Sequence, residues 1–260
     1  MTAQMPAPAH PERTPRSAPA VERAFRLLEI VRREPEALGA SELARRLSLS
    51  KGSVHALLTA LVRVEALEAH GPHHRYRLGP LLHTLGQQPT ESHHLRENAR
   101  PFLREISRAT NETAILGEIR GDHVVVVERQ QGEHALSVSA ALGTRVPLVA
   151  SGIVKAVLAA IPPEQRAAFL AEIPLRRFTA RSPGPQQLLA AVAATEREGY
   201  AIAEEEYLEG VSAVAGAITA GRGHVVAVIY VVGFTVRLTP TAWRRAGRLV
   251  ARAAAELSTA

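Results

Sequence analysis

The segment from Ala40 to Leu61 carries the pattern that most restricts how this chain can fold. Two short helices that meet at a fixed angle need apolar residues on their inner faces and a small residue at their contact. Ala44 is small, and the apolar side chains recur at the required spacing, at Leu43, Leu47, Leu49, Val54 and Leu57. Ser48 stands at the turn, where glycine is usual, so we expect it to adopt a left-handed or bridging conformation. The pattern predicts a helix-turn-helix.

A third helix should precede this motif. Apolar residues at helical spacing favour a helix over Val21–Arg33, and residues 37–40 (ALGA) break that pattern. Ser41 is the expected N-cap of the second helix and Ser50 that of the third, which begins at Lys51. Residues 1–19 are rich in Pro and Ala and lack the apolar core of a signal peptide, so we expect a disordered tail.

The third helix offers an outer face with few apolar groups. When its apolar side is buried, six residues face outward: Lys51, Gly52, Ser53, His55, Ala56 and Thr59. Recognition helices present such N-terminal outer residues to base edges in the major groove. We expect Ser53 and His55 to contact bases, whereas Ser50 and Lys51, at a helix start suited to anions, would meet phosphate. The alternative is a three-helix packing unit with a solvated face.

Residues 66–79 alternate in polarity and turn at Gly71-Pro72, which predicts a β-hairpin. A hairpin directly after a recognition helix is a wing, and its basic and imidazole side chains would face phosphate or the minor groove. These side chains belong to His70, His73, His74, Arg75 and Arg77. Adjacent histidines on a strand point to opposite faces, so a metal site at His73-His74 is the less favoured reading.

These residues together resemble the winged helix-turn-helix of IclR-family bacterial transcription regulators. The family's recognition helix opens with Lys, two small residues, Val, and His or Arg, which residues 51–55 (KGSVH) match one by one. Tyr76, Leu78 and Gly79 match the Tyr-x-Leu-Gly that closes the family's wing. The resemblance implies a homodimer or homotetramer bound to a pseudo-palindromic operator in double-stranded DNA. Repression with ligand-driven release is the favoured mode, and activation is the alternative.

The rest of the chain predicts an α+β fold, an antiparallel sheet covered by helices. A helical connector over residues 83–112 is expected to be interrupted near Gln87-Pro89 and to resume near Leu95. Two apolar stretches flank Arg120-Gly121-Asp122 as a hairpin, and the second is apolar enough to be a central strand. We therefore expect a tail (1–19), a winged helix-turn-helix domain (20–82), the connector (83–112) and a further domain (113–260).

That further domain resembles the family's effector-binding domain, whose fold is related to GAF and PAS sensor modules. The stretches LVASGIVKAVLA (148–159) and EEEYLEGVSAVAGAI (204–218) carry the resemblance, with departures at Val154 and at Gly216-Ala217. It implies an effector pocket in which backbone amides near Gly152 and Ile153, beside Ser151, meet an anionic or polar ligand group. The expected pocket walls are Leu142, Ala203, Ala213, Tyr230 and Val232.

The pocket positions also bear on the kind of effector. Several of them are polar in relatives that hold small carboxylates, but here they are alanine, valine and one tyrosine. Such a pocket should prefer a larger, apolar or aromatic ligand, although ordinary core packing would place the same residues there. Lys155 is the only lysine besides Lys51, and either a contact with an acidic group or a structural role would explain it.

Composition restricts the remaining functions. The chain has no cysteine and no apolar run near the ~20 residues that cross a bilayer, so we expect no thiolate chemistry and a cytoplasmic protein without membrane contact. Residues 1–80 hold 12 of the 31 basic but 8 of the 25 acidic side chains, a modest lean towards nucleic acid.

An enzyme is the less favoured class. Ser151 lacks the Gly-x-Ser-x-Gly frame of a nucleophile elbow, and Glu204, Glu205 and Glu206 in a row are typical of a solvated strand end. No phosphate-binding Gly-rich loop is present, and residues 81–260 contain no His-x-x-x-His motif, so we expect no cofactor and no metal. The main alternative to a DNA-binding regulator is a ligand-binding module without specific DNA recognition.

Overall fold

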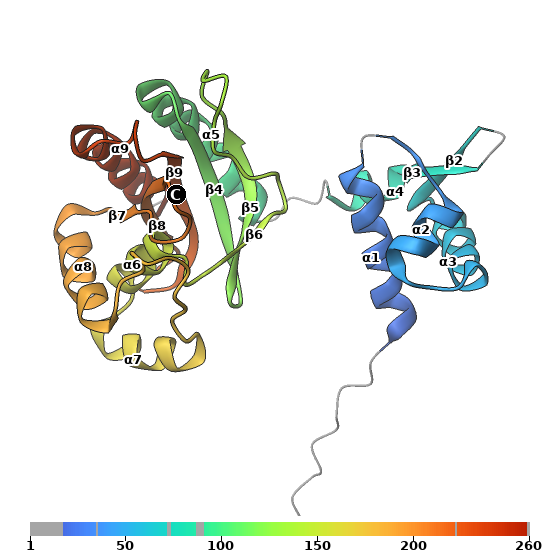
Figure 1. The fold of residues 1–260 in the computed structure, drawn as a ribbon, viewed down its shortest axis with the longest axis horizontal. Coiled ribbons are helices and arrows are strands. Elements are labelled where there is room, and N and C mark those ends of the chain that lie inside the picture. Colours follow the sequence, from blue (N-terminus) through green and yellow to red (C-terminus); the bar gives the residue numbers. More distant parts are fainter. Residues whose placement is uncertain (1–17, 35, 72–73, 87–90, 222, 259–260) are drawn as a thin grey trace, which may run out of the picture. The chain divides into compact units, whose positions relative to one another are not determined.

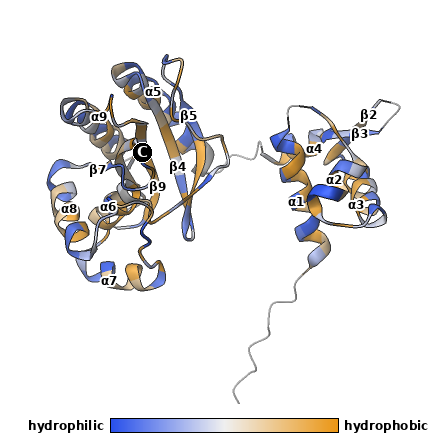
Figure 2. Cartoon of the chain, viewed as in Figure 1, coloured by the Kyte–Doolittle hydropathy of each residue, from blue (hydrophilic) through white to orange (hydrophobic). Residues whose placement is uncertain are grey.

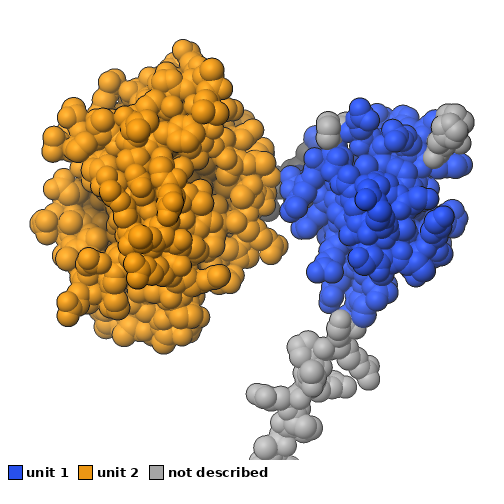
Figure 3. All heavy atoms as spheres, in the orientation of Figure 1, with its two compact units in different colours: residues 1–88 blue, residues 89–260 orange. Residues whose placement is uncertain are grey.

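The chain forms two compact units, Met1–Gln88 and Pro89–Ala260 (Figures 1 and 3). The computed structural model describes residues 18–34, 36–71, 74–86, 91–221 and 223–258. The expected disordered tail therefore lies almost entirely outside the described residues, as does the interruption expected near Gln87-Pro89. No helix within the described ranges is long and apolar enough to cross a bilayer.

The first unit is a small helical domain with a three-stranded antiparallel sheet of order β1-β3-β2. Its elements are α1 (Pro19–Arg33), β1 (Leu38–Gly39), α2 (Ala40–Leu47), α3 (Lys51–Arg63), β2 (Leu67–His70), β3 (Arg75–Leu78) and α4 (Pro80–Gly86). The first helix begins two residues before the predicted Val21, because Pro19 fits a first helical turn, where no amide donor is needed.

The segment between α1 and α2 differs from the prediction. Residues 37–40 were expected only to break the helical pattern, but Leu38 pairs with Tyr76 across β1 and β3, and both side chains are buried. This pairing brings the chain to Gly39 in an extended conformation, so α2 begins at Ala40. Ser41 therefore lies inside the first turn, and the prediction that it caps the helix is wrong.

The helix-turn-helix itself matches the sequence pattern. Ser48 has φ 54° and ψ 41°, which confirms the left-handed conformation expected at the turn. The Ser50 hydroxyl accepts a hydrogen bond from the Ser53 amide at 3.2 Å, which confirms the predicted cap of α3. Ala44, Val54 and Leu58 are all buried, and the last two have no exposed surface. The two helices thus pack through the residues that their spacing predicts.

The wing closes against the end of α3. The Gly79 amide donates to the Ala66 carbonyl at 3.0 Å, and a Cβ at Gly79 would lie 2.2 Å from the Glu65 carbonyl oxygen. No side chain fits so close to backbone, so glycine is required where β3 ends. The hairpin is therefore held beside the C-terminal end of α3.

The second unit is built on a six-stranded antiparallel sheet of order β6-β5-β4-β9-β8-β7. Its strands are β4 (Thr113–Arg120), β5 (His123–Gln130), β6 (Arg145–Pro147), β7 (Ala201–Glu204), β8 (Val211–Thr219) and β9 (Val225–Phe234). Its helices are α5 (Glu91–Thr110), α6 (Ser151–Ala160), α7 (Pro163–Glu172), α8 (Pro185–Glu198) and α9 (Pro240–Ser258). The α+β prediction is confirmed. The hairpin of β4 and β5 is also as predicted, but β5 lies one place from the edge, and β4 and β9 are central.

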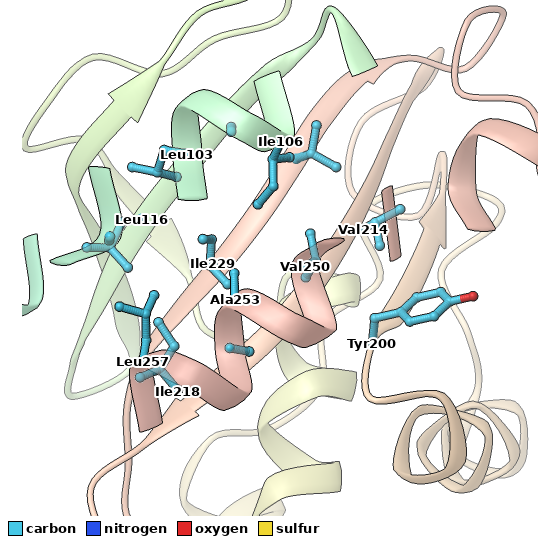
Figure 4. Packing of buried hydrophobic residues seen from close by; sticks show 14 of the residues in the cluster. Leu103, Ile106, Leu116, Tyr200, Val214, Ile218, Ile229, Val250, Ala253 and Leu257 are labelled. Atoms are coloured by element: carbon cyan, nitrogen blue, oxygen red, sulfur yellow. The ribbon is translucent and has the colours of Figure 1, made fainter. Parts of the chain in front are cut away.

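Helices cover both faces of this sheet. Leu116 and Ile229 pack with α5 and α9 on one face (Figure 4), whereas their neighbours Ile115 and Tyr230 belong to the cluster under α6 on the other face. Successive residues of a strand point to opposite faces, so a central strand covered on both sides is apolar throughout. Hydrophobic residues accordingly run along β4 in Figure 2. The helix α5 begins at Glu91, four residues before the predicted restart.

Candidate functional site

The outer face of α3 is exposed where the sequence predicted. This holds for all six residues: Lys51, Gly52, Ser53, His55, Ala56 and Thr59. The first turn of α3 contains no acidic residue. The Ser53 hydroxyl lies 2.9 Å from the Ser50 hydroxyl, which orients it at the helix start. A helix N-terminus with an unopposed lysine and short polar side chains has the chemistry to approach a phosphate and the adjoining base edges.

The wing carries its charges unevenly. Arg77 is paired across the hairpin with Glu68, the Nε to Oε2 distance being 3.1 Å, and His70 Nε2 lies 3.5 Å from the same oxygen. Arg75 and His74 are exposed. The predicted His73 lies outside the described residues. One strong cation of the wing is thus already partnered within the protein.

Ion pairs with Glu42 and Glu34 offset the basic charges of α2, the helix before α3. Glu42 accepts hydrogen bonds from Arg45 and Arg46, which lower the pKa of its carboxyl group. Arg46 also pairs with Glu34, whose carboxylate is the leading cause of its raised pKa. Both arginines of α2 are therefore already paired with acidic side chains. Exposed basic side chains without a described acidic partner lie instead on α3 and the wing.

The second unit contains a cavity of about 140 Å³ between the sheet and the start of α6. Its walls come from β4, β6, β7, β8, β9, α6 and the segments around residues 139 and 207. The lining residues are Ile115, Val138, Ser139, Ala140, Val146, Ala150, Gly152, Ile153, Ala203, Glu206, Tyr207, Leu208, Val211, Ala213, Ala215, Tyr230 and Val232. The cavity is thus almost entirely apolar.

Most, but not all, of the predicted pocket positions line this cavity. Gly152, Ile153, Ala203, Ala213, Tyr230 and Val232 do so. Leu142 does not, and 45% of its surface is exposed, so its placement in the wall is wrong. It lies in a tight turn that a hydrogen bond of 3.0 Å from the Thr144 amide to the Ala141 carbonyl closes. Ser151 is the first residue of α6, and its side chain lies outside the described part.

The start of α6 is packed closely onto the sheet. A Cβ at Gly152 would lie 3.3 Å from the Ala203 Cβ and 3.7 Å from the Ala215 Cβ. The Ile153 amide donates to the Ala150 carbonyl at 2.8 Å. This amide is therefore already bonded, which contradicts the expectation that it meets a ligand. The local turn that starts the helix uses it first.

Lys155 and Glu206 form a buried ion pair beside the cavity. The Lys155 Nζ lies 2.7 Å from each Glu206 carboxylate oxygen and 2.8 Å from the Ile202 carbonyl oxygen. The Lys155 side chain is 5% exposed and that of Glu206 is 14% exposed. The expectation of a solvated strand end is wrong for Glu206, because the chain turns at Glu205 (φ 56°) and directs it inward. Burial raises the pKa of Glu206, and Lys155 opposes that rise.

Tyr230 supplies a hydroxyl in the buried wall. Burial raises its pKa far above the ordinary value, with a smaller contribution from Tyr207, so the phenol stays protonated. None of the described histidines of this unit is among the described lining residues. His123 pairs with Asp122 at the β4–β5 turn, and His134 lies 3.9 Å from Glu112. The described lining therefore places no imidazole beside a nucleophile in this cavity.

Several lining residues have no counterpart in the sequence predictions. Ser139 and Ala140 line the cavity from an irregular segment that Arg129 holds by hydrogen bonds of 2.8 Å to the Ser139 hydroxyl and 3.0 Å to the Ala140 carbonyl. No periodicity marks such a segment. Glu206 could have been suspected, because a buried lysine needs an acidic partner.

Comparisons with known proteins agree with this division into two units. The family profile described as IclR helix-turn-helix domain matches residues 20–71, and that described as Bacterial transcriptional regulator IclR C-terminal matches residues 87–259. The HTH-type transcriptional regulator BhcR of Paracoccus denitrificans is 31% identical over 240 residues, covering 92% of this chain and 86% of the relative.

Solved structures share the fold of this chain. The Thermotoga maritima IclR structure aligns with a TM-score of 0.77 at 22% identity, covering 93% of this chain and 98% of that one. An IclR homolog from Microbacterium hydrocarbonoxydans, complexed with 4-hydroxybenzoate, aligns with a TM-score of 0.73 at 27% identity and covers 92% and 98%.

Proposed function

The chain belongs to the IclR family of bacterial transcriptional regulators, which are not enzymes. From that premise we propose that the exposed face of α3 reads an operator and that the cavity of the second unit holds the effector controlling it. One observation supports the proposed reading of the operator. The outer face of α3 is exposed, and it begins with Lys51 in a first turn that contains no acidic residue.

In the DNA complex, Lys51 and the Ser50 end of α3 contact the phosphate backbone, whereas Ser53 and His55 contact base edges. Gly52 and Ala56 allow the helix to approach closely, and Thr59 extends the face by one turn. The wing adds phosphate or minor-groove contacts through His74, Arg75 and Arg77, and His73, which lies outside the described residues, is proposed to join them. Phosphate contacts set affinity and register, and the base contacts set the preferred sequence.

The effector is a compact apolar or aromatic molecule. The cavity of about 140 Å³ is close to the ~150 Å³ of an engineered apolar cavity that binds benzene, so it matches a single ring. The Microbacterium homolog was crystallised with 4-hydroxybenzoate, which also has one ring. Leu142 is excluded from this site, and the remaining contacts come from the walls around Gly152, Ala203 and Tyr230.

The working protein is a homodimer or homotetramer in the cytoplasm. Each copy has one recognition helix, so a symmetric pair of copies reads a pseudo-palindromic operator with half-sites about one helical turn apart. An effector acts only through its differential affinity for the DNA-binding and non-binding arrangements. We propose repression that is relieved by the effector.

The test is binding of the full chain to DNA upstream of its own gene, measured by fluorescence anisotropy at several salt concentrations beside an unrelated duplex. Lys51→Ala should weaken binding to both duplexes and reduce the slope of log K against log salt by about 0.9, the value of one phosphate contact. His55→Ala should change the preference between operator variants instead. If both variants bind like the parent, α3 does not read DNA. If the parent itself binds both duplexes weakly and equally, a ligand-binding module without sequence recognition is favoured.

A further inference from the structure

The described lining of the cavity contains no cationic side chain, which is unusual for a site that would hold an acid. Among the described lining residues the ionisable ones are Glu206, Tyr207 and Tyr230, and no lysine, arginine or histidine is present. The two hydroxyls and Ser139 can offer hydrogen bonds but no positive charge. A ligand carboxylate placed here would lose its hydration without meeting a cation, which is strongly unfavourable.

Lys155 is the cation paired with the lining residue Glu206, but it has no donor left for a ligand. An ammonium group has three N–H donors. In this structure two point to the Glu206 oxygens at 2.7 Å and the third to the Ile202 carbonyl at 2.8 Å. Lys155 could bind a ligand carboxylate only by releasing one of these buried acceptors, so the ion pair does not serve as an anion site.

Glu206, by contrast, keeps acceptor capacity. A carboxylate offers about four lone-pair positions. Lys155 uses one on each oxygen, and the nearby backbone of Glu204 also favours the charged carboxylate by lowering its pKa. At least one acceptor position therefore remains on a residue that lines the cavity. A hydroxyl group of a ligand is suited to fill it.

A ligand ammonium fits less well than a hydroxyl. Lys155 already neutralises Glu206, so a second cation beside the pair would meet repulsion and would also lose its hydration among apolar walls. A neutral hydroxyl donates one hydrogen bond to the charged acceptor and brings little desolvation cost. The charges around the cavity should therefore distinguish three ring compounds of similar shape: one with a hydroxyl group, one with a carboxylate and one with an ammonium group.

We infer that the effector is an uncharged single-ring compound bearing a hydroxyl group, and that Glu206 accepts its hydrogen bond and selects it over the corresponding carboxylates and amines. This rests on the proposed effector function of the cavity. Glu206 is then a specificity-determining residue of a site that is otherwise set by size and apolar contact.

The experiment is isothermal titration calorimetry of the full chain at pH 7 with four probes of similar size: 4-methylphenol, toluene, benzoate and benzylamine. 4-Methylphenol should bind roughly ten-fold or more tightly than toluene, the range expected of a hydrogen bond to a charged acceptor. Benzoate and benzylamine should bind more weakly than toluene. Benzoate or benzylamine binding as tightly as 4-methylphenol would overturn the inference, as would equal binding of 4-methylphenol and toluene.

Two variants identify the acceptor. Glu206→Gln should keep toluene binding, which reports an intact cavity, and lose most of the preference for 4-methylphenol. Tyr230→Phe removes the buried phenol hydroxyl of the cavity wall and should keep the preference for 4-methylphenol over toluene. The reverse result, preference lost in Tyr230→Phe and kept in Glu206→Gln, would assign the hydrogen bond to Tyr230 and refute the role of Glu206. If Glu206→Gln no longer folds, the four-probe series on the parent and on Tyr230→Phe decides whether Glu206 or Tyr230 makes the hydrogen bond.

Operator binding of the same protein preparation separates this inference from the proposed function. A chain that binds its operator but none of the four probes refutes the ligand class and leaves the regulator intact. A chain that binds the probes as predicted but no DNA supports the ligand class and refutes the assigned DNA face.

Discussion

Replacing Glu68 by glutamine should strengthen DNA binding, although Glu68 itself contacts no DNA in our proposal. Its carboxylate now holds Arg77 across the wing, 3.1 Å from the Arg77 Nε, and lies 3.5 Å from His70. All three side chains are substantially exposed, so the pairing contributes little to stability, ~0–1 kcal/mol. Its removal should leave the hairpin folded and free Arg77 to meet a phosphate.

The magnitude follows from counterion release. One additional phosphate contact raises the slope of log K against log salt by about 0.9, which corresponds to roughly five-fold tighter binding at about 0.15 M salt. Arg75→Gln should act in the opposite direction by a similar factor, because Arg75 is exposed on the same hairpin and pairs with no acidic side chain among the described residues. The effects should appear on operator and unrelated DNA alike.

The assay is anisotropy over a salt series for the parent, Glu68→Gln, Arg77→Gln and the double variant. In the Arg77→Gln background, Glu68→Gln should gain much less, because there is no arginine to free. Glu172→Gln, an exposed change of the same charge on α7, controls for net charge. Equal gains with and without Arg77, or no gain at all, would refute the reasoning that the wing arginine is withheld from DNA by Glu68.

Two further predictions concern stability. Glu112 is 1% exposed and accepts from the Arg237 Nη2 at 2.9 Å, while the Arg237 side chain is 29% exposed. Arg237→Ala, which strands a buried carboxylate, should lower the free energy of unfolding by about 3 kcal/mol, more than Glu112→Ala, which leaves a cation that water can reach. Urea denaturation of both variants checks this, and the opposite order would contradict it. Ser48→Gly should stabilise the helix-turn-helix by about 1 kcal/mol, because Ser48 holds a left-handed conformation (φ 54°) that glycine adopts without strain. Slower hydrogen exchange of the α2 and α3 amides would show this gain, and Ser48→Ala serves as a control that should not produce it.

Local features of the sequence were enough to predict the first unit. The helix-turn-helix follows from apolar spacing, a cap at Ser50 and a turn residue at Ser48, all of which act over fewer than five residues. The same is true of the hairpin around Gly121 and of the apolar strands of the second unit, which alternate between two covered faces. The exposed face of α3 follows too, because burying one side of a helix determines the other.

Contacts between distant residues decided the rest. The strand β1 forms because Leu38 pairs with Tyr76 of β3. A strand of two residues is too short to show an alternating pattern in the sequence, so it could not be predicted. Lys155 pairs with Glu206, 51 positions later, and only the turn at Glu205 brings that carboxylate inward. The sequence by itself determined the family, the presence of two units and the exposed face of α3. The tertiary structure alone decided the size and charge of the cavity, because a cavity is the space that remains after non-local packing, and no local pattern encodes it.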